Sequence, residues 1–223
     1  MDENTLSPTL RCRFSKTGPI RYISHLDLTR AFLRALVRAE IDLKYSEGFN
    51  PHPKFSFALP LSVGTESRAE ICDFALAPNA LLPPEEVKRR LEKEMPAGIT
   101  IQSVAVAEEK FSAIAFCAYE IFLPLADSAP EEVTCAIQAP LLCTKKTKKG
   151  KTVELDIADR VERFSCHRKD GGLFLDVLLC ADGEKYLKPE LLLDALQQKM
   201  PALDLTRKHI LRTGTFRTDK SAF

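Results

Sequence analysis

Residues 21–61 constrain the fold of this chain more than any other stretch, because they combine a capped helix, an irregular loop and an apolar strand. Ser24 precedes apolar residues at helical spacing, and Asp27 lies three positions later, as in a capping box. We therefore expect a helix that begins at Ser24 and ends near residues 40–42. One of its faces is apolar and is expected to contact a core, through Leu28, Phe32, Ala35, Leu36 and Ala39.

The loop after this helix, YSEGFNPHP at residues 45–53, cannot form a regular element because glycine and two prolines interrupt it. Strands are expected on both sides of it, at residues 10–14, 55–61, 70–76 and 99–107. A second helix is expected to begin at Pro83-Pro84, because proline is tolerated in the first helical turn. Residues 10–107 therefore have the order strand, helix, strand, strand, helix, strand, which is that of the ferredoxin-like motif.

The remaining residues, 117–223, repeat this order loosely, with a closing strand expected at residues 208–216. Asp170-Gly171 predicts a hairpin turn, and the basic run KKTKKGK at residues 145–151 predicts a hairpin tip that can touch phosphates. A different α+β arrangement with an extra hairpin is an alternative for this half. We predict an α+β protein of two tandem ferredoxin-like (βαββαβ) halves, 10–107 and 117–223, with a flexible leader at 1–9 and a linker at 108–116.

Composition and missing motifs narrow the classes of function. The seven cysteines form no C-x-x-C pair, which argues against a zinc knuckle or a radical-SAM iron–sulfur cluster in this chain and favours reduced thiols. Neither a glycine-rich nucleotide loop nor a G-x-S-x-G or H-E-x-x-H motif occurs. We expect no cofactor and no bound metal. The first residues are acidic and polar, and no apolar run approaches the roughly 18 residues of a membrane span, so we expect a cytoplasmic protein without membrane contact.

Basic residues are concentrated early in the chain, although the net charge of all 223 residues is only +1. Residues 11–54 hold nine basic and four acidic side chains, and Arg30, Arg34 and Arg38 recur every four residues on one helical face. A basic stripe is the usual footprint of nucleic-acid binding, and arginine can hold phosphates in a bidentate manner. The alternative is a solvated helix face, or arginines paired with acids of a neighbouring helix.

The loop at residues 45–54 adds aromatic side chains to this basic region. Tyr45 and Phe49 can stack on bases, as proteins do with single-stranded RNA. The alternative for Phe49 is that it packs in the core while Asn50 shapes a turn. The full set of residues expected to contact RNA is Arg21, Arg30, Arg34, Arg38, Lys44, Tyr45, Phe49, Asn50, Lys54 and Arg212.

Two histidines in this region are the candidates for catalysis. His25 lies at the start of the first helix, and His52 lies in the loop that follows it. If they met, they could act as an acid–base pair in RNA cleavage or as metal ligands. The start of a helix and the loop after its end usually lie apart, so we assign no catalytic residue, and we expect a binding protein rather than an enzyme.

The motifs SHLD, YSEGFNPHPKFSFALPL and the late RTGTF carry a resemblance to a known family. The chain resembles the radical-SAM-linked proteins, a bacterial domain of unknown function found alone beside a gene for a cobalamin-type radical SAM protein, or fused to the C-terminus of one. A weaker likeness is to the tandem ferredoxin-like RNA-processing proteins of CRISPR systems. The first resemblance implies an accessory role beside a SAM-dependent enzyme, and it supplies no catalytic residues.

Three functions follow as hypotheses. The first is a non-catalytic module that binds structured RNA, such as tRNA or ribosomal RNA, and presents it to a separate radical SAM enzyme encoded nearby. The second is a protein–protein adaptor in which residues 21–61 dock on that enzyme without RNA. The third is a metal-independent endoribonuclease that uses His25 or His52.

Overall fold

The computed structural model describes residues 8–80, 82–138, 140–146 and 152–223. The fold is α+β, as expected, and the described residues contain four α-helices. The chain divides into two compact units, Met1–Phe111 and Ser112–Phe223, each of which is described by itself.

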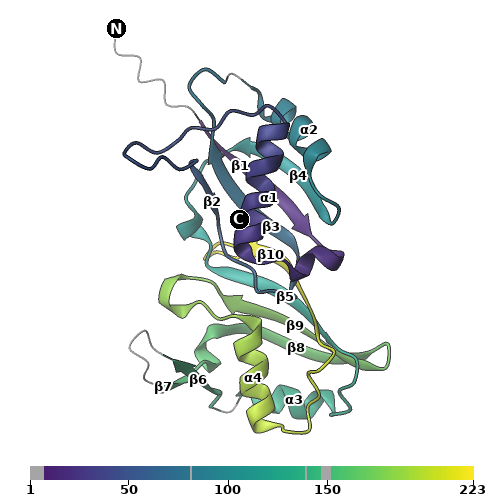
Figure 1. Ribbon diagram of the computed structural model, residues 1–223. Coiled ribbons are helices and arrows are strands. Elements are labelled where there is room, and N and C mark those ends of the chain that lie inside the picture. The colour runs from purple at the N-terminus through teal and green to yellow at the C-terminus, as the bar shows by residue number, and fades with distance from the viewer. Residues whose placement is uncertain (1–7, 81, 139, 147–151) are drawn as a thin grey trace. The chain divides into compact units, whose positions relative to one another are not determined.

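The first unit is an antiparallel sheet with two helices on one face (Figure 1). Its strands are β1 (Thr9–Lys16), β2 (Phe55–Phe57), β3 (Glu66–Ala75) and β4 (Ile99–Val106), and its helices are α1 (His25–Arg38) and α2 (Pro84–Glu94). A short 3-10 helix, η1 (Gly18–Tyr22), joins β1 to α1. Within this unit the strands are paired in the order β4-β1-β3-β2.

The core of the first unit lies between α1 and the sheet. The five residues predicted to face it are all buried: Leu28, Phe32, Ala35, Leu36 and Ala39. Phe32 is the centre of an aromatic cluster, with its ring centroid 4.7 Å from that of Phe14 and 5.5 Å from that of Phe57. Side chains alternate between the two faces along a strand. The neighbours of Phe14 on β1 and of Cys72 on β3 therefore point to the sheet face away from α1.

The predicted helix cap is confirmed. Ser24 Oγ accepts a hydrogen bond from the Asp27 backbone N–H at 3.1 Å and donates one to Asp27 Oδ2 at 2.7 Å. The helix ends at Arg38, and Glu40 then takes a left-handed backbone conformation with φ of 54°. Since such a conformation cannot continue a helix, the end falls close to the predicted one.

Two strand predictions need correction. The strand expected at residues 55–61 is only three residues long, because its pairing with β3 ends at Phe57, and Pro60 further on lacks the backbone N–H that a longer strand needs. The strand expected at residues 70–76 begins earlier, at Glu66, because β1 pairs with it as far as Ser67. The irregular loop between α1 and β2 is as expected, with only isolated bridges in it.

The second unit is also a helix-covered antiparallel sheet. The pairing order within this unit is β10-β5-β9-β8, where β5 is Phe116–Leu123, β8 is Val161–Lys169, β9 is Gly172–Cys180 and β10 is His209–Phe216. The helices α3 (Pro130–Gln138) and α4 (Pro189–Lys199) contact each other (Figure 1). Short 3-10 helices also occur in this part of the chain: η2 (Phe111–Ala113), whose first residue is the last residue of the first unit, η3 (Ala158–Arg160) and η4 (Gly183–Lys185).

Both hairpin predictions for this unit can be examined. Asp170 and Gly171 have φ of 50° and 81° and connect β8 to β9, so the predicted turn is confirmed. The extra hairpin is formed by β6 (Leu142–Lys146) and β7 (Thr152–Asp156). The lysine-rich tip between them, residues 147–151, lies outside the described residues.

The helices and the cysteines bear on two classes considered above, membrane proteins and proteins with zinc or iron–sulfur sites. No helix among the residues described is long and apolar enough to cross a membrane. The seven cysteines are thiols rather than disulfides, and Cys12, Cys72, Cys117 and Cys143 are buried.

Candidate functional site

The three arginines of α1 differ in their partners. Arg30 Nη1 lies 3.0 Å from Asp27 Oδ1, and Arg38 Nε lies 2.8 Å from Glu94 Oε2 on α2. Arg34 is exposed and forms no hydrogen bond or ion pair with any described residue. This row of arginines therefore combines ion pairing with solvent exposure. The guanidinium groups of Arg30 and Arg38 are paired with acids, whereas that of Arg34 can contact a ligand.

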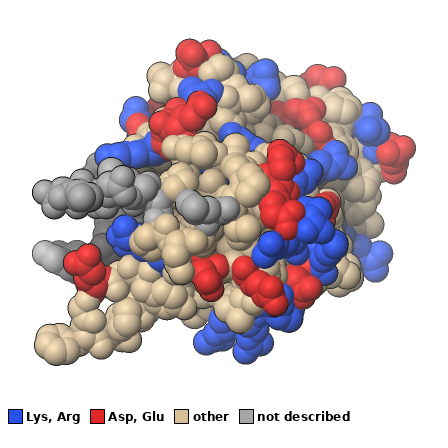
Figure 2. Space-filling view, turned by 90° about the horizontal axis from the view of Figure 1, so that it is seen from above, with Lys and Arg blue, Asp and Glu red and all other residues tan. Residues whose placement is uncertain are grey.

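Charge is mixed on the face of the molecule that is seen from above. Figure 2 shows Lys and Arg side chains interspersed with Asp and Glu on the face seen from above. Such a surface provides no broad basic field, so any attraction for an anionic ligand must come from a few positioned cations.

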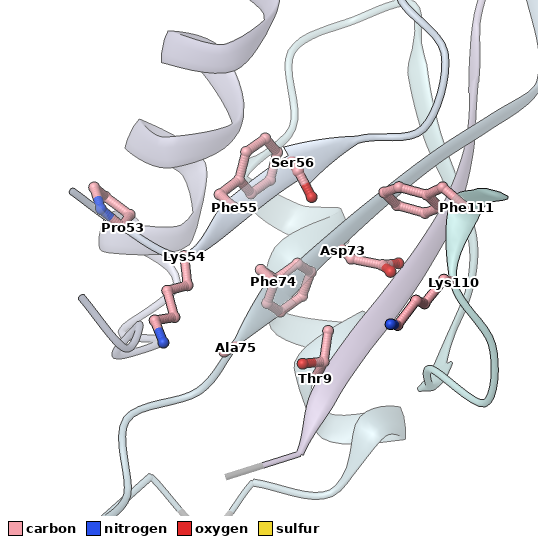
Figure 3. Close-up of a pocket in the computed structure, with 10 residues that line it drawn as sticks. All are labelled: Thr9, Pro53, Lys54, Phe55, Ser56, Asp73, Phe74, Ala75, Lys110 and Phe111. Carbon is pink, nitrogen blue, oxygen red and sulfur yellow. The ribbon is translucent and has the colours of Figure 1, made fainter. Parts of the chain in front are cut away.

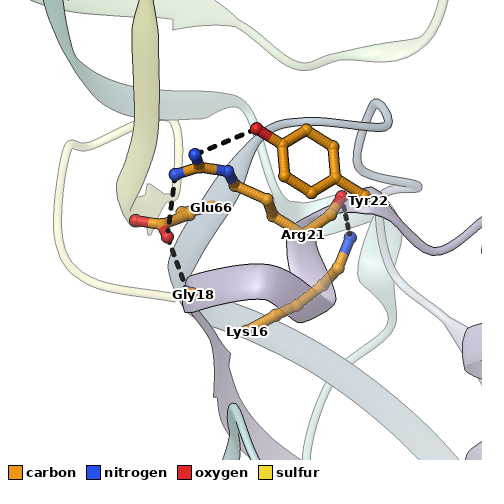
Figure 4. A network of polar contacts seen from close by, with 5 residues as sticks. All are labelled: Lys16, Gly18, Arg21, Tyr22 and Glu66. Carbon is orange, nitrogen blue, oxygen red and sulfur yellow. Dashed lines mark hydrogen bonds and ion pairs between the residues drawn. The ribbon is translucent and has the colours of Figure 1, made fainter.

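Arg21 is held in a network of its own (Figure 4). Its Nη1 lies 3.3 Å from Glu66 Oε1, and its Nη2 donates to Tyr22 Oη at 3.0 Å. The hydrogen bond to Tyr22, with the attraction of Glu66, raises the pKa of Arg21. The same Glu66 oxygen accepts from the Gly18 backbone N–H at 2.6 Å. Arg21 therefore stabilises the η1 turn, with its charge largely compensated by Glu66.

The loop at residues 44–54 forms a narrow arm. Tyr45 and Pro53 face each other as an isolated antiparallel bridge, and the Ser46 backbone N–H donates to the His52 carbonyl at 2.8 Å. The Ser46 hydroxyl accepts from the His52 N–H at 3.0 Å. Paired backbone on both sides fixes where the tip of the arm lies.

The tip of this arm carries an aromatic side chain in solvent. Phe49 has a relative exposure of 113%, and Tyr45 at the base of the arm is 52% exposed. The alternative in which Phe49 packs in the core is therefore wrong, because two paired segments carry it away from the sheet. Asn50 is exposed beside it, and the arm begins and ends at Lys44 and Lys54, neither of which forms an ion pair with a described residue.

The two histidines have separate surroundings. The ring of His25 packs edge-on against Phe57, with 5.2 Å between centroids. The backbone of His52 pairs with Ser46 in the arm, and its side chain is exposed. No contact between the two histidines occurs in the part of the chain that is described, and no group of three or more His, Cys, Asp and Glu residues there could hold a metal ion.

Arg212 belongs to the second unit. It lies on β10 opposite Tyr119 of β5, and its Nε donates to Tyr119 Oη at 3.3 Å. Burial is the main cause that raises the pKa of Tyr119, and the charge of Arg212 opposes that rise. Arg212 thus has a packing role beside Tyr119 within its own unit.

A pocket of about 450 Å³ opens on the first unit beside the base of the arm (Figure 3). Lys54 and Ser56 border it on one side, and Lys110 and Phe111 border it on the other. Between them lies Asp73. Sequence reasoning found only Lys54: Ser56 lies in the same motif, YSEGFNPHPKFSFALPL, but was not identified as a contact, and Asp73, Lys110 and Phe111 lie in no motif. The signal that could have been noticed is the basic–aromatic pair Lys110-Phe111, a few residues after the end of β4.

A second, smaller hollow lies along the C-terminal half of α1. Its volume is about 160 Å³, and its lining includes Leu33, Val37, Ile41 and Tyr45. Val37 is 73% exposed, although it lies on a helix whose inner face is fully buried. Most side chains that line the hollow are apolar, although Asp42 also lines it, so an apolar chain segment can pack in this groove.

Comparisons with known proteins give one informative match. A family model described as "Uncharacterized protein conserved in bacteria (DUF2344)" matches residues 9–189. No curated protein matches the chain. Among solved structures, an unknown protein from Galdieria sulphuraria is 11% identical, with 91% of this chain and 95% of that chain covered and a TM-score of 0.27. A TM-score of that size does not establish a shared fold.

Proposed function

We propose that this chain, which belongs to the DUF2344 family of uncharacterised proteins conserved in bacteria, is a non-catalytic module that binds structured RNA. The observation that carries the proposal is the arm at residues 44–54, whose tip holds Phe49 in solvent at 113% exposure. Exposing a phenylalanine side chain forgoes the roughly 1.5–3 kcal/mol that its burial would contribute, so a partner that covers the ring would recover that free energy.

An unpaired RNA base fits the chemistry of the arm. Bases of single-stranded loops stack on aromatic side chains with little sequence preference, because every base has a π face. Lys44 and Lys54 at the base of the arm can contact the phosphates on either side of such a base. Arg34, which has no acidic partner among the described residues, is a third phosphate contact in this proposal.

The proposed partner protein is a cobalamin-type radical SAM enzyme encoded nearby, to which this chain would present the RNA in the cytoplasm. The resemblance of SHLD and YSEGFNPHPKFSFALPL to the radical-SAM-linked proteins supports this. The separate surroundings of His25 and His52 favour binding over cleavage by this chain itself. The chemistry would then reside in the partner, and the RNA would be a tRNA or ribosomal RNA.

A finer description of the fold is also proposed. Each unit would be a ferredoxin-like βαββαβ domain, with β6 and β7 inserted as a hairpin in the second. The orders β4-β1-β3-β2 and β10-β5-β9-β8 support this, because each brings the first and third strands of its unit to the centre. The helix positions also support a ferredoxin-like fold, because in each unit one helix follows the first strand and another precedes the last strand.

The test is fluorescence anisotropy with labelled tRNA and ribosomal RNA fragments at several salt concentrations. We expect affinity that falls steeply with salt, since phosphate contacts release counterions. Phe49→Ala should weaken binding about tenfold, in line with roughly 1–3 kcal/mol per stacked base, whereas Phe49→Tyr should retain it. Lys93→Ala, which removes an exposed cation of α2, is the matched control. Binding that is absent, or that is equal for Phe49→Ala and the wild type, would contradict the proposal.

A protein–protein adaptor is the second candidate, and the apolar groove at Val37 favours it. Here a segment of the radical SAM enzyme would pack in the groove, with an acid placed against Arg34. Val37→Asp should then abolish co-purification of the two proteins after nuclease treatment. Co-purification that requires intact RNA would instead support the first function.

A further inference from the structure

The pocket beside the arm is built around a buried ion pair. Arg11 is 6% exposed and holds Asp73 with two hydrogen bonds, Nε to Oδ1 at 2.9 Å and Nη2 to Oδ2 at 2.8 Å. Asp73 follows Cys72 on β3, so strand alternation turns it away from the core beneath α1. The carboxylate of Asp73 is therefore already occupied on both oxygens by a protein cation.

The same guanidinium group positions the far wall of the pocket. Arg11 Nη2 also donates to the Glu109 carbonyl at 2.6 Å, and the guanidinium carbon lies 4.9 Å from the centroid of the Phe111 ring. These contacts fix the chain on both sides of Lys110. The wall formed by Lys110 and Phe111 is thus anchored to the sheet by a buried side chain.

The charge that faces the pocket is positive. Asp73 is compensated by Arg11, which leaves Lys54 on one side and Lys110 on the other. Both lysines are exposed, and neither forms an ion pair with a described residue. In Figure 3 Lys54 and Lys110 lie on opposite sides of the space, with Thr9 and Ser56 contributing hydroxyl groups at its border. An anion with several acceptor oxygens suits such an arrangement.

The size and the aromatic wall select the class of anion. A volume of about 450 Å³ is in the range of small-ligand pockets and far exceeds the space that inorganic phosphate needs. One face of the Phe111 ring is covered by Arg11. A planar base can pack against aromatic side chains, and a phosphate attached to it would lie between the ammonium groups.

We propose that this pocket binds a nucleoside phosphate, with the phosphate held by Lys54 and Lys110 and the base packed against Phe111. The nucleotide is either a unit of a bound RNA or a free mononucleotide. The inference deepens the proposed RNA binding, on which it rests for the first of these sources. Lys54 would then contribute to both features, because it lies at the base of the arm and also lines the pocket.

The test measures two ligands with the full-length chain. Calorimetry with AMP, GMP, CMP and UMP measures free nucleotides, with inorganic phosphate as a reference, and anisotropy with a labelled single-stranded octanucleotide measures RNA. We expect Lys110→Gln to weaken binding of whichever ligand occupies the pocket about tenfold, the loss typical of a charge-assisted hydrogen bond. Lys93→Gln is the control. Lys110 is exposed, so the variant should fold, and Phe111→Leu tests the base contact separately.

The outcomes separate this inference from the proposed function. RNA binding that weakens in Phe49→Ala but is unchanged in Lys110→Gln and Phe111→Leu, without mononucleotide binding, overturns the pocket proposal and leaves the RNA function standing. Mononucleotide binding that depends on Lys110, without RNA binding, supports the pocket and overturns the RNA function. Inorganic phosphate that binds as tightly as every mononucleotide overturns the assignment of a nucleotide.

Discussion

Arg11 and Asp73 form a bidentate ion pair across β1 and β3, where their Cα atoms are directly opposite each other in the antiparallel register. The side chains are 6% and 15% exposed, so each charge would be only poorly hydrated if its partner were removed. A buried pair of this kind is costly to break, because one uncompensated charge stays in a poorly solvated place.

Replacing Asp73 should therefore destabilise the protein strongly. We expect Asp73→Asn to lower the free energy of unfolding by about 3 kcal/mol, the range found when one partner of a buried ion pair is lost. Glu94→Gln, which removes the partner of the half-exposed Arg38, should cost under about 1 kcal/mol. Denaturant unfolding of both variants measures the difference, and equal losses would show that burial of the first pair contributes nothing.

The cysteines should react in an order set by burial. Cys12 and Cys72 are directly opposite each other on β1 and β3 and are fully buried, whereas Cys135 on α3 is exposed. Burial raises the pKa of Cys72, and it raises the pKa of the half-buried Cys166 to about 11. Since the thiolate is the reactive form, iodoacetamide at pH 8 should modify Cys135 first and Cys72 only after unfolding. Timed alkylation with mass spectrometry checks this, and early labelling of Cys72 would contradict it.

Local signals explain which parts of the fold could be predicted. The cap at Ser24 and the apolar face of α1 are encoded within a few residues, and both were found. The turn at Asp170-Gly171 was found for the same reason. The length of β2 was overestimated because an apolar run indicates burial but not strand pairing, and the pairing with β3 ends at Phe57.

Contacts between distant residues explain what sequence reasoning missed in the site. Arg38 is paired with Glu94, which is 56 positions away, and no periodicity in α1 reveals it. The wall at Lys110 and Phe111 depends on Arg11, which reaches the Glu109 carbonyl across 98 positions. The exposure of Phe49 also depends on pairing of the arm's two sides, whereas the sequence alone slightly favoured a buried ring.

The cap of α1 gives a prediction for stability. Ser24→Ala removes the hydrogen bond from the Asp27 N–H to the Ser24 hydroxyl and should cost about 1 kcal/mol of unfolding free energy. Ser24→Asn, which preserves a side-chain acceptor at this position, should cost much less. Urea unfolding followed by circular dichroism measures both variants. A loss of the same size in Ser24→Asn would show that the hydroxyl acts through another contact.

The first turns of α2 provide a prediction for the pH dependence of stability. Glu86 accepts hydrogen bonds from Arg89 Nη2 at 2.6 Å and from Arg90 Nε at 2.6 Å, and these bonds, Arg89 first, lower the pKa of Glu86 from 4.5 to about 2. A carboxyl group whose pKa is lower in the folded state stabilises the fold above its unfolded pKa. The contribution of Glu86 should therefore be complete above about pH 5 and should disappear as the pH falls from 4.5 to 2.

Glu86→Gln tests this pH window directly. We expect the variant to be slightly less stable than the wild type at pH 7, because the side chain is at the surface, and equally stable near pH 2. Glu85→Gln removes the same charge one position earlier without removing the hydrogen bonds to Arg89 and Arg90, so it is the matched control. Thermal unfolding across this pH range, with an NMR titration of the Glu86 carboxyl group, provides the measurement. A titration midpoint near 4.5, or a stability difference that persists at pH 2, would show that the two arginines do not hold this carboxylate in solution.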